Sequence, residues 1–360
     1  IGNRTGDVSN SFWNTATSTQ ANGDGSGGSA GITGKTTTEM QTLSTFTDAG
    51  WDIDDKGGTD KTWRIYEGQT APLLRNFMSL LDLSKDQTLT YNGGTQRFAL
   101  PKSADRMVLG IASGRNADTY KNDAYSGQQG YDIIDGGNLI INPAALHLFA
   151  TTDTKTYDGT TSTNGIVKVK GLQTQNENTD KLKLATFDKK PPIETQGDSI
   201  TNLTQSFKSK NVLGEKKSTL NVNAGFVIND GNGGKNYEVT VESNVGTINK
   251  ARATVTANSK TTTYNGLKQS VDGFTVSGLV NGESKEVLES VTTSEQFVAP
   301  FAPKGEHKSR SGVTRTDAGK YVHVAYGHDN NYELGFNQGA LNIKKARATV
   351  TANSKTTTYN

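Results

Sequence analysis

The residues of this chain best suited to chemistry are carboxylates set among glycines. Four of them fall within nine residues, Asp52, Asp54, Asp55 and Asp60. Calcium takes about six to eight oxygen ligands from carboxylates, amides and carbonyls. This cluster is therefore the candidate calcium site, and calcium is the one cofactor that the sequence suggests. The cluster matches neither the EF-hand loop nor the RTX nonapeptide. The alternative is that these residues form tight turns without a metal.

Histidine is the other residue type that could carry catalysis. The chain has four, His147, His307, His323 and His328. None lies in an H-E-x-x-H motif or beside a plausible Ser–Asp pair, so we predict no catalytic site and no enzyme activity. His323 alternates with Val322 and Val324, and this pattern predicts a strand with the histidine facing solvent.

Composition favours small β modules over one large core. The 360 residues are 32% hydrophobic and 21% charged, with a net charge of +2, 40 glycines and no cysteine. A near-neutral chain lacks the basic surplus that binding nucleic acid requires. The absence of cysteine excludes disulfides and thiolate metal sites, and we interpret it as typical of an exported bacterial surface protein. No apolar run approaches the roughly 18 residues of a membrane span.

A tandem repeat organises the chain. Residues 251–265 read ARATVTANSKTTTYN, and residues 346–360 read the same, at an offset of 346 − 251 = 95. A fixed offset on this scale is typical of an array of domains. We therefore expect residues 346–360 to begin a further copy and the chain to be a slice of a longer protein.

Each module opens with the phrase Thr-Tyr-(Asp/Asn), followed by Gly in the first three copies. Its tyrosines are Tyr91, Tyr157, Tyr264 and Tyr359. Asn-Gly and Asp-Gly favour tight turns. We predict that the first three rings are buried beneath these turns and that Tyr359, in the partial copy, is exposed. Each module closes on a strand after which the next begins at once, so linkers are nearly absent and we expect a stiff, elongated rod.

The N-terminal region has a different character. Thr36 and Glu39 are three apart, a capping-box pattern that predicts a helix over 36–44. Trp51 and Trp63 then centre two short strands, and we predict that both indoles are buried. This region resembles the tail of the Gly-Leu-Gly (GLUG) repeat region of large bacterial adhesins in the segments SNSFWNTATSTQ, GKTTTEMQ, FTDAGWD and EGQTAPLLR. The resemblance implies the end of a parallel β-helix, for which the tryptophans would be a cap; a free-standing small β domain is the alternative.

Two further resemblances cover most of the remaining chain. KTYDGTTSTNG, followed by LNVNAGFVINDGNGGKNYEV, is similar to the YDG module of bacterial adhesins. Residues 251–345 resemble the related MBG module, and residues 84–146 a shorter relative. The expected organisation is a β-helix terminus (1–80), a first module (84–146), a second (147–250), a third (251–345) and a truncated copy (346–360). The fold class is all-β, with each module an immunoglobulin-like sandwich or a β-grasp.

These resemblances imply a non-enzymatic, extracellular role. Such modules occur in filamentous-haemagglutinin-like surface adhesins, many exported by two-partner secretion, so an outer-membrane export partner is implied. We expect a stalk that serves cell adhesion or biofilm formation by projecting a region that binds a surface glycan, a protein or a matrix polysaccharide; the ligand is unknown. One alternative is that the modules themselves bind polysaccharide or protein. Another is a structural fibre subunit with lateral self-association through strand edges.

Overall fold

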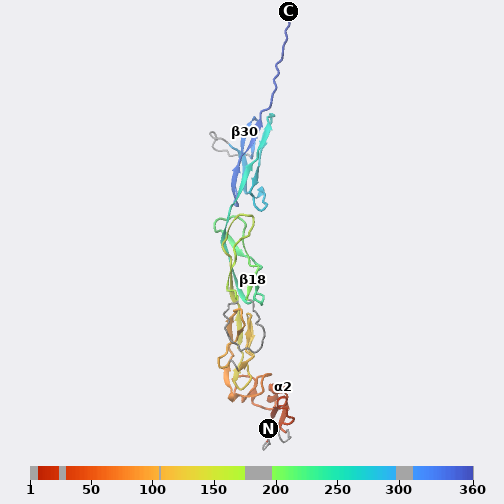
Figure 1. Ribbon diagram of the computed structural model, residues 1–360, viewed down its shortest axis with the longest axis vertical. Coiled ribbons are helices and arrows are strands. Elements are labelled where there is room, and N and C mark those ends of the chain that lie inside the picture. The colour runs from red at the N-terminus through yellow and green to blue at the C-terminus, as the bar shows by residue number, and fades with distance from the viewer. Residues whose placement is uncertain (1–6, 24–29, 105–106, 175–196, 297–310, 360) are drawn as a thin grey trace. The chain divides into compact units, whose positions relative to one another are not determined.

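The computed structural model describes residues 7–23, 30–104, 107–174, 197–296 and 311–359. Strands dominate it, which confirms the all-β class (Figure 1). The helical segments of the described residues are all short: α1 (Thr15–Ser18), α2 (Thr37–Met40), α3 (Leu43–Thr47), η1 (Arg75–Phe77) and η2 (Lys285–Val287).

The chain forms two compact units. Unit 1 comprises Ile1–His147, Lys170–Thr201 and Val227–Thr240. Unit 2 comprises Leu148–Val169, Asn202–Phe226 and Val241–Asn360. The boundary between the units therefore falls within the second module, and each unit contains one complete transition from a module to the next.

The N-terminal region of unit 1 contains short parallel strand pairs. Strand β1 (Ser11–Asn14) pairs in parallel with β2 (Ile32–Lys35), and β3 (Ile53–Asp54) with β4 (Trp63–Arg64). Strand β5 (Leu73–Leu74) pairs antiparallel with β4. Parallel pairing of successive short strands is the arrangement that a β-helix uses, and the β-helix terminus stays a prediction that this pairing supports.

The predicted capping box is present, but the predicted helix is too long. Thr36 Oγ1 accepts from the Glu39 N–H at 3.3 Å, and Glu39 Oε2 accepts from the Thr36 N–H at 2.7 Å. Helix α2 ends at Met40, and α3 starts after Thr42, whose backbone is extended. The Leu43 N–H donates to the Glu67 carboxylate at 2.7 Å, and this bond turns the chain between the two helices.

The two tryptophans lie at the rim of a small core. Phe46, Ile53 and Ile65 are buried, and Trp51 and Trp63 pack against them half-buried, with ring centroids 4.9 Å apart. The prediction of full burial is therefore wrong. Trp51 Nε1 donates to the Asn10 carbonyl at 2.7 Å, which satisfies its polar edge at the surface.

The described residues of the first module form nine short strands. They are β6 (Ser79–Asp82), β7 (Gln87–Thr90), β8 (Gln96–Arg97), β9 (Val108–Leu109), β10 (Ser113–Gly114), β11 (Asp118–Lys121), β12 (Tyr125–Ser126), β13 (Tyr131–Ile134) and β14 (Asn138–Asn142). They form a three-stranded sheet, β11-β14-β7, and the pairs β13-β6, β10-β8 and β12-β9. Strand β6 precedes the predicted start at residue 84, so the sheets of this module begin at Ser79.

The second module repeats this plan in longer form. Its strands are β15 (Ala144–Phe149), β16 (Thr154–Thr156), β17 (Lys168–Lys170), β18 (Ser199–Thr201), β19 (Gln205–Phe207), β20 (Ser218–Val222), β21 (Val227–Asn229), β22 (Tyr237–Glu242) and β23 (Asn244–Asn249). The sheets are β17-β15-β22, β16-β23-β20-β19 and β18-β21. Strands β15, β17 and β22 each run through the boundary between the units.

The third module, in unit 2, is a two-layered sandwich. Its strands are β24 (Ala251–Ala257), β25 (Lys260–Thr263), β26 (Gln269–Val271), β27 (Phe274–Ser277), β28 (Ser290–Glu295), β29 (Val313–Arg315), β30 (Gly319–His328), β31 (Tyr332–Asn337) and β32 (Gly339–Lys344). Sheet β27-β24-β31 faces sheet β25-β32-β30-β28, and Val255 and Ala257 of one pack on Ala325 of the other. In the described part of this module no α-helix crosses a sheet, which favours the sandwich over the β-grasp.

One strand arrangement is shared by all three modules. The strand before the Tyr-(Asp/Asn)-Gly phrase pairs in parallel with the last strand of its module, as β7 does with β14, β16 with β23 and β25 with β32. A single residue, Pro143 or Lys250, separates that last strand from the first strand of the next module. The prediction of nearly absent linkers is confirmed.

Candidate functional site

Two contacts between successive modules are each built from two tyrosines, a carboxylate and a basic side chain, and we call them joints. Joint 1 consists of Tyr91, Arg115, Asp198 and Tyr237, all in unit 1. The hydroxyls of Tyr91 and Tyr237 both donate to Asp198 Oδ2, at 2.8 and 2.5 Å. Arg115 Nη2 lies 3.4 Å from Asp198 Oδ1. The two tyrosine rings meet edge to face at a centroid distance of 5.5 Å.

Joint 2 has the same construction within unit 2. It consists of Tyr157, Lys210, Glu283 and Tyr332. The Tyr157 hydroxyl donates to Glu283 Oε1 and the Tyr332 hydroxyl to Oε2, both at 2.7 Å. Lys210 Nζ also donates to Oε1, at 3.0 Å. The rings again meet edge to face, with centroids 5.4 Å apart. In both joints the earlier module supplies one tyrosine and the base, and the later module supplies the carboxylate and the other tyrosine.

An asparagine ahead of the second tyrosine adds a further bond to each joint. Asn236 Oδ1 accepts from the Ala117 N–H at 2.8 Å, and Asn331 Oδ1 accepts from the Val212 N–H at 2.9 Å. The carbonyls of the same asparagines accept from the first N–H of the later module's first strand, at Ala144 and Ala251. Each asparagine therefore bridges the end of one module and the start of the next.

Local sequence positions the first tyrosine of each joint. The Tyr91 and Tyr157 N–H groups donate to the carbonyls of Asn142 and Asn249, both at 2.8 Å, which continues the parallel pairing described above. The following residue closes an Asx turn, since its side-chain oxygen accepts from the N–H two residues on. Gly93 and Gly159 then take positive φ values, a conformation that favours glycine.

The electrostatics favour neutral phenols in both joints and a charged Glu283 carboxylate in joint 2. Burial, followed by the hydrogen bond to Asp198, raises the pKa of Tyr91 to about 12. Burial likewise raises the pKa of Tyr157 and of Tyr332 above the ordinary value. Burial of Glu283 acts to raise its pKa, but the hydrogen bonds from Tyr332, Tyr157 and Lys210 outweigh it and lower the pKa. Each carboxylate accepts hydrogen bonds from two tyrosines and a base that belong to two successive modules, an arrangement suited to holding modules together.

The predicted burial of the repeated tyrosines holds for two of three. Tyr91 and Tyr157 are buried, and Tyr359 is exposed as predicted. Tyr264 is 42% exposed, so that prediction is wrong. The physical reason is that the covering groups come from the following module's tyrosine and carboxylate, whereas the prediction assigned them to the module's own turn.

Two of the four aspartates of the candidate calcium site have separate partners. Asp52 accepts from the Thr62 N–H at 2.8 Å and pairs with Lys61 at 3.0 Å. The Thr62 N–H and then Lys61 lower the pKa of Asp52 to about 2. Asp54 pairs with Arg75 at 2.7 Å, while Asp55 and Asp60 are exposed. Nowhere in the described residues do three or more Asp, Glu, His or Cys side chains gather as a metal site would require. Calcium stays a prediction without geometric support.

Sequence reasoning missed a buried ion-pair network near the N-terminus. Asp132 Oδ2 accepts from Arg75 Nη1 at 2.6 Å and from the Gly58 N–H at 2.9 Å, and Arg64 Nε lies 3.6 Å from Asp132 Oδ1. Tyr66 Oη also donates to the Tyr131 carbonyl at 2.6 Å. These bonds attach the N-terminal region to the first module. As in the joints, a buried carboxylate accepts from several donors.

The carboxylates and bases of the two joints were also missed. The signal for the asparagine–tyrosine pairs was present, since Asn331-Tyr332 follows Asn236-Tyr237 by 331 − 236 = 95 residues. The carboxylates carry no such signal. One is an aspartate and the other a glutamate, and they are 283 − 198 = 85 residues apart.

His323 is buried, contrary to the prediction. Its side chain is 0% exposed on β30, on the same face as Ala325, and its Nδ1 lies 2.8 Å from the Asn258 carbonyl. Alternation along a strand defines two faces without saying which is inward. Here the small Ala325 and the carbonyl acceptor make the histidine face the inner one.

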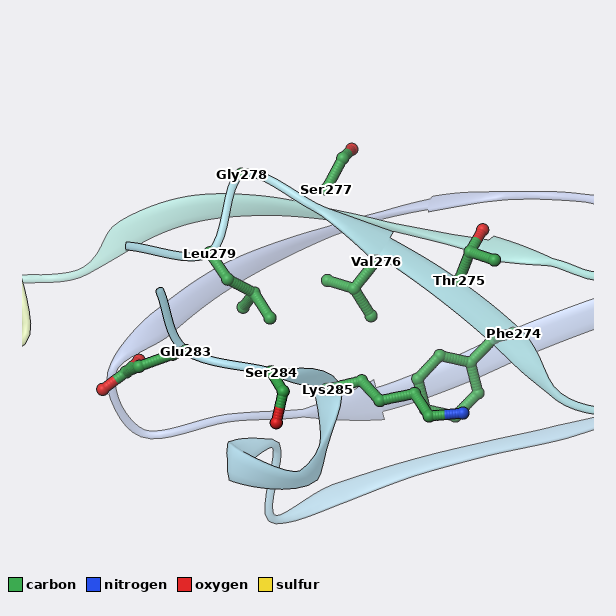
Figure 2. Close-up of a pocket in the computed structure, with 9 residues that line it drawn as sticks. All are labelled: Phe274, Thr275, Val276, Ser277, Gly278, Leu279, Glu283, Ser284 and Lys285. Carbon is green, nitrogen blue, oxygen red and sulfur yellow. The ribbon is translucent and has the colours of Figure 1, made fainter. Parts of the chain in front are cut away.

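A shallow depression of about 440 Å³ lies beside joint 2 in unit 2. It is lined by Phe274–Leu279 and Glu283–Lys285, and Figure 2 shows the Lys285 side chain reaching to the Phe274 ring, with Glu283 directed away from it. Lys285 Nζ lies 5.8 Å from the ring centroid, so the cation already occupies the aromatic face. Glu283 is engaged by joint 2, and the depression has no further charged pair to bind a ligand.

Comparisons with known proteins add little. No protein-family model matches the chain, and no curated protein matches it. Solved structures that match include the crystal structure of Drosophila N-cadherin EC1-4, at 8% sequence identity over 74% of each chain and with a TM-score of 0.18. A similarity this weak carries no argument, and the resemblances to adhesin modules stay predictions. In the part of the chain that the structure describes, no helix is both long and apolar enough to cross a membrane.

Proposed function

We propose that this chain is part of the extracellular stalk of a large bacterial adhesin, in which tandem modules project or link a binding region. The observation that carries the proposal is the joint made twice from equivalent side chains, at Asp198 and at Glu283. Repeating one specific joint along a chain serves to set the geometry between neighbours, which is the requirement of a spacer.

The chemistry of the joints suits a mechanical role. Hydrogen bonds are directional, and bonds to a charged acceptor contribute about 1.5–3 kcal/mol each. Glu283 accepts three such bonds from groups on both sides of joint 2. Bending the joint would stretch these bonds and expose a carboxylate that has lost its partners, which is costly. A one-residue linker adds a covalent limit to the same motion.

The proposal includes location and partners. We place the chain at the bacterial cell surface or in the secreted fraction, exported through an outer-membrane partner. The distal ligand would be a surface glycan, a protein or a matrix polysaccharide. The burial of Tyr91 and Tyr157 counts against the alternative in which the repeated tyrosines form a row that stacks on sugar rings.

Small-angle X-ray scattering of this chain tests the stalk. A compact domain of 360 residues has a radius of gyration of roughly 21 Å. We expect a value well above it, because single-residue linkers and fixed joints keep the modules from folding back on one another. A radius near 21 Å at low concentration and moderate salt would refute the proposal.

A further inference from the structure

The Tyr-(Asp/Asn)-Gly turn has a neighbour at the first two module ends, whereas at the third no described residue lies against it. A Cβ on Gly93 would lie 3.2 Å from the Gln173 side chain, and one on Gly159 would lie 2.9 Å from that of Asn281. Around Gly266, no described atom lies within 4 Å of that position. We call Tyr264, Asn265 and Gly266 the open end.

The open end is already in the conformation of the two closed ones. The Tyr264 N–H donates to the Lys344 carbonyl at 2.8 Å, the same bond and length as at Tyr91 and Tyr157. Asn265 Oδ1 accepts from the Leu267 N–H at 3.0 Å, which forms the Asx turn, and Gly266 has a φ of 76°. The backbone therefore needs no rearrangement to form a joint, and what differs is the cover over the ring.

The segment after the third module lacks a partner in the same way. Residues 346–359 form no strand, and in Figure 1 this blue segment runs away from the sheets as extended chain. The identical residues 251–263 form β24 and β25, which pair in parallel with β31 and β32. Val255 is fully buried there, whereas the equivalent Val350 is 94% exposed. Within the described residues, this sequence forms strands at 251–263, where β31 and β32 pair with it, and none at 346–359.

We propose that the open end binds a module of the 251–345 type that begins at Ala346. Its counterparts of Asn331 and Tyr332 would take the positions those residues hold in joint 2, and its counterpart of Glu283 would accept from the Tyr264 hydroxyl. The choice of occupant follows from continuity, because Ala251 donates to Asn331 of its own module and Ala346 has the same sequence context. This inference rests on the proposed function, since it extends the same array by one joint.

The test compares this chain with one extended after Asn360 by a copy of residues 266–345. Exposed phenols are nitrated with tetranitromethane, and the sites are quantified by mass spectrometry. In the present chain we expect Tyr264 and Tyr359 to react and Tyr157 to be protected. In the extended chain we expect the nitration of Tyr264 to slow by a factor of about ten or more, because the reaction then requires the new joint to open. Tyr359 becomes the new open end and stays reactive, which makes it an internal control.

Each outcome decides the proposal. Hydrogen exchange over residues 346–352 reports whether the added copy folds. If it folds and Tyr264 stays as reactive as Tyr359, the proposal is wrong; it is also wrong if the copy stays unfolded, because the same sequence folds at residues 251–345. Replacing the added copy's counterpart of Tyr332 by alanine should restore nitration of Tyr264. None of these failures alters the radius of gyration of the present chain, so they remain distinct from failure of the stalk proposal.

Discussion

Replacing Tyr157 by phenylalanine removes one hydroxyl from joint 2 and leaves the ring in place. That hydroxyl donates to Glu283 Oε1 at 2.7 Å, and the tyrosine is 3% exposed. The aromatic contact with Tyr332 and the packing against the core of Phe207, Leu220 and Ile248 are retained. The substitution therefore isolates the contribution of a single hydrogen bond to the carboxylate.

We expect the substitution to lower the free energy of opening joint 2 by about 1.5 kcal/mol. A hydrogen bond to a charged group contributes about 1.5–3 kcal/mol, and the lower value applies because Glu283 keeps its bonds from Tyr332 and Lys210. Since 1.36 kcal/mol corresponds to a factor of about ten, amides that exchange through opening of joint 2 should exchange about tenfold faster. The matched control is Tyr264→Phe, at the same position of the repeated phrase, for which we expect a change below about 0.5 kcal/mol.

Hydrogen exchange monitored by mass spectrometry is the suitable assay, because a chain of several modules does not unfold in one two-state step. The peptides to follow cover β24 and the turn at Asp158–Gly159. Equal effects of Tyr157→Phe and Tyr264→Phe would refute the reasoning, since only Tyr157 lies in a closed joint. An effect of Tyr157→Phe below about 0.5 kcal/mol would show that the carboxylate is satisfied without it.

Two other predictions follow from the same contacts. Trp51→Ala should reduce the local stability of the N-terminal region by about 2–3 kcal/mol, less than the roughly 3–5 kcal/mol of a fully buried aromatic, because the indole is half-buried. Hydrogen exchange in α3 measures this loss, and Phe77→Ala is the control because Phe77 is 70% exposed. Equal effects of the two substitutions would contradict the prediction. Joint 2 should also weaken in acid. The pKa of Glu283 is lowered from its ordinary 4.5, so its stabilisation is complete above pH 4.5 and is lost as the pH falls through the folded-state pKa. Glu283→Gln should remove this loss of protection of the β24 amides at acid pH. An unchanged pH dependence in the variant would contradict the role given to Glu283.

Local rules explain what could be predicted. The capping box at Thr36 and Glu39, the Asx-Gly turns and the one-residue linkers all depend on neighbours within a few residues, so composition and spacing were sufficient. Alternating polar and apolar residues likewise predicted strands such as β24 and β30. These features depend on backbone geometry that the local sequence controls directly.

The joints depended on groups far apart in the chain. Asp198 lies 107 residues from Tyr91, and Glu283 lies 126 from Tyr157, with no shared motif to connect them. The sequence showed that a tyrosine recurs in one register, but not that its cover comes from the next module. That is why Tyr264 was predicted to be buried and is exposed. His323 was assigned to solvent for a different reason, because alternation along β30 does not say which face is inward.

The identical residues 251–265 and 346–360 separate what the sequence determines from what the tertiary structure decides. By itself the sequence determined an all-β chain, its turns, its short linkers and the register of the repeated tyrosine. Only the tertiary structure decided where these residues form strands, because 251–263 lie beside β31 and β32, whereas no described strand pairs with 346–359. A strand's hydrogen bonds and its buried face are both supplied by other segments, so the same residues form β24 and β25 in one place and extended chain in the other.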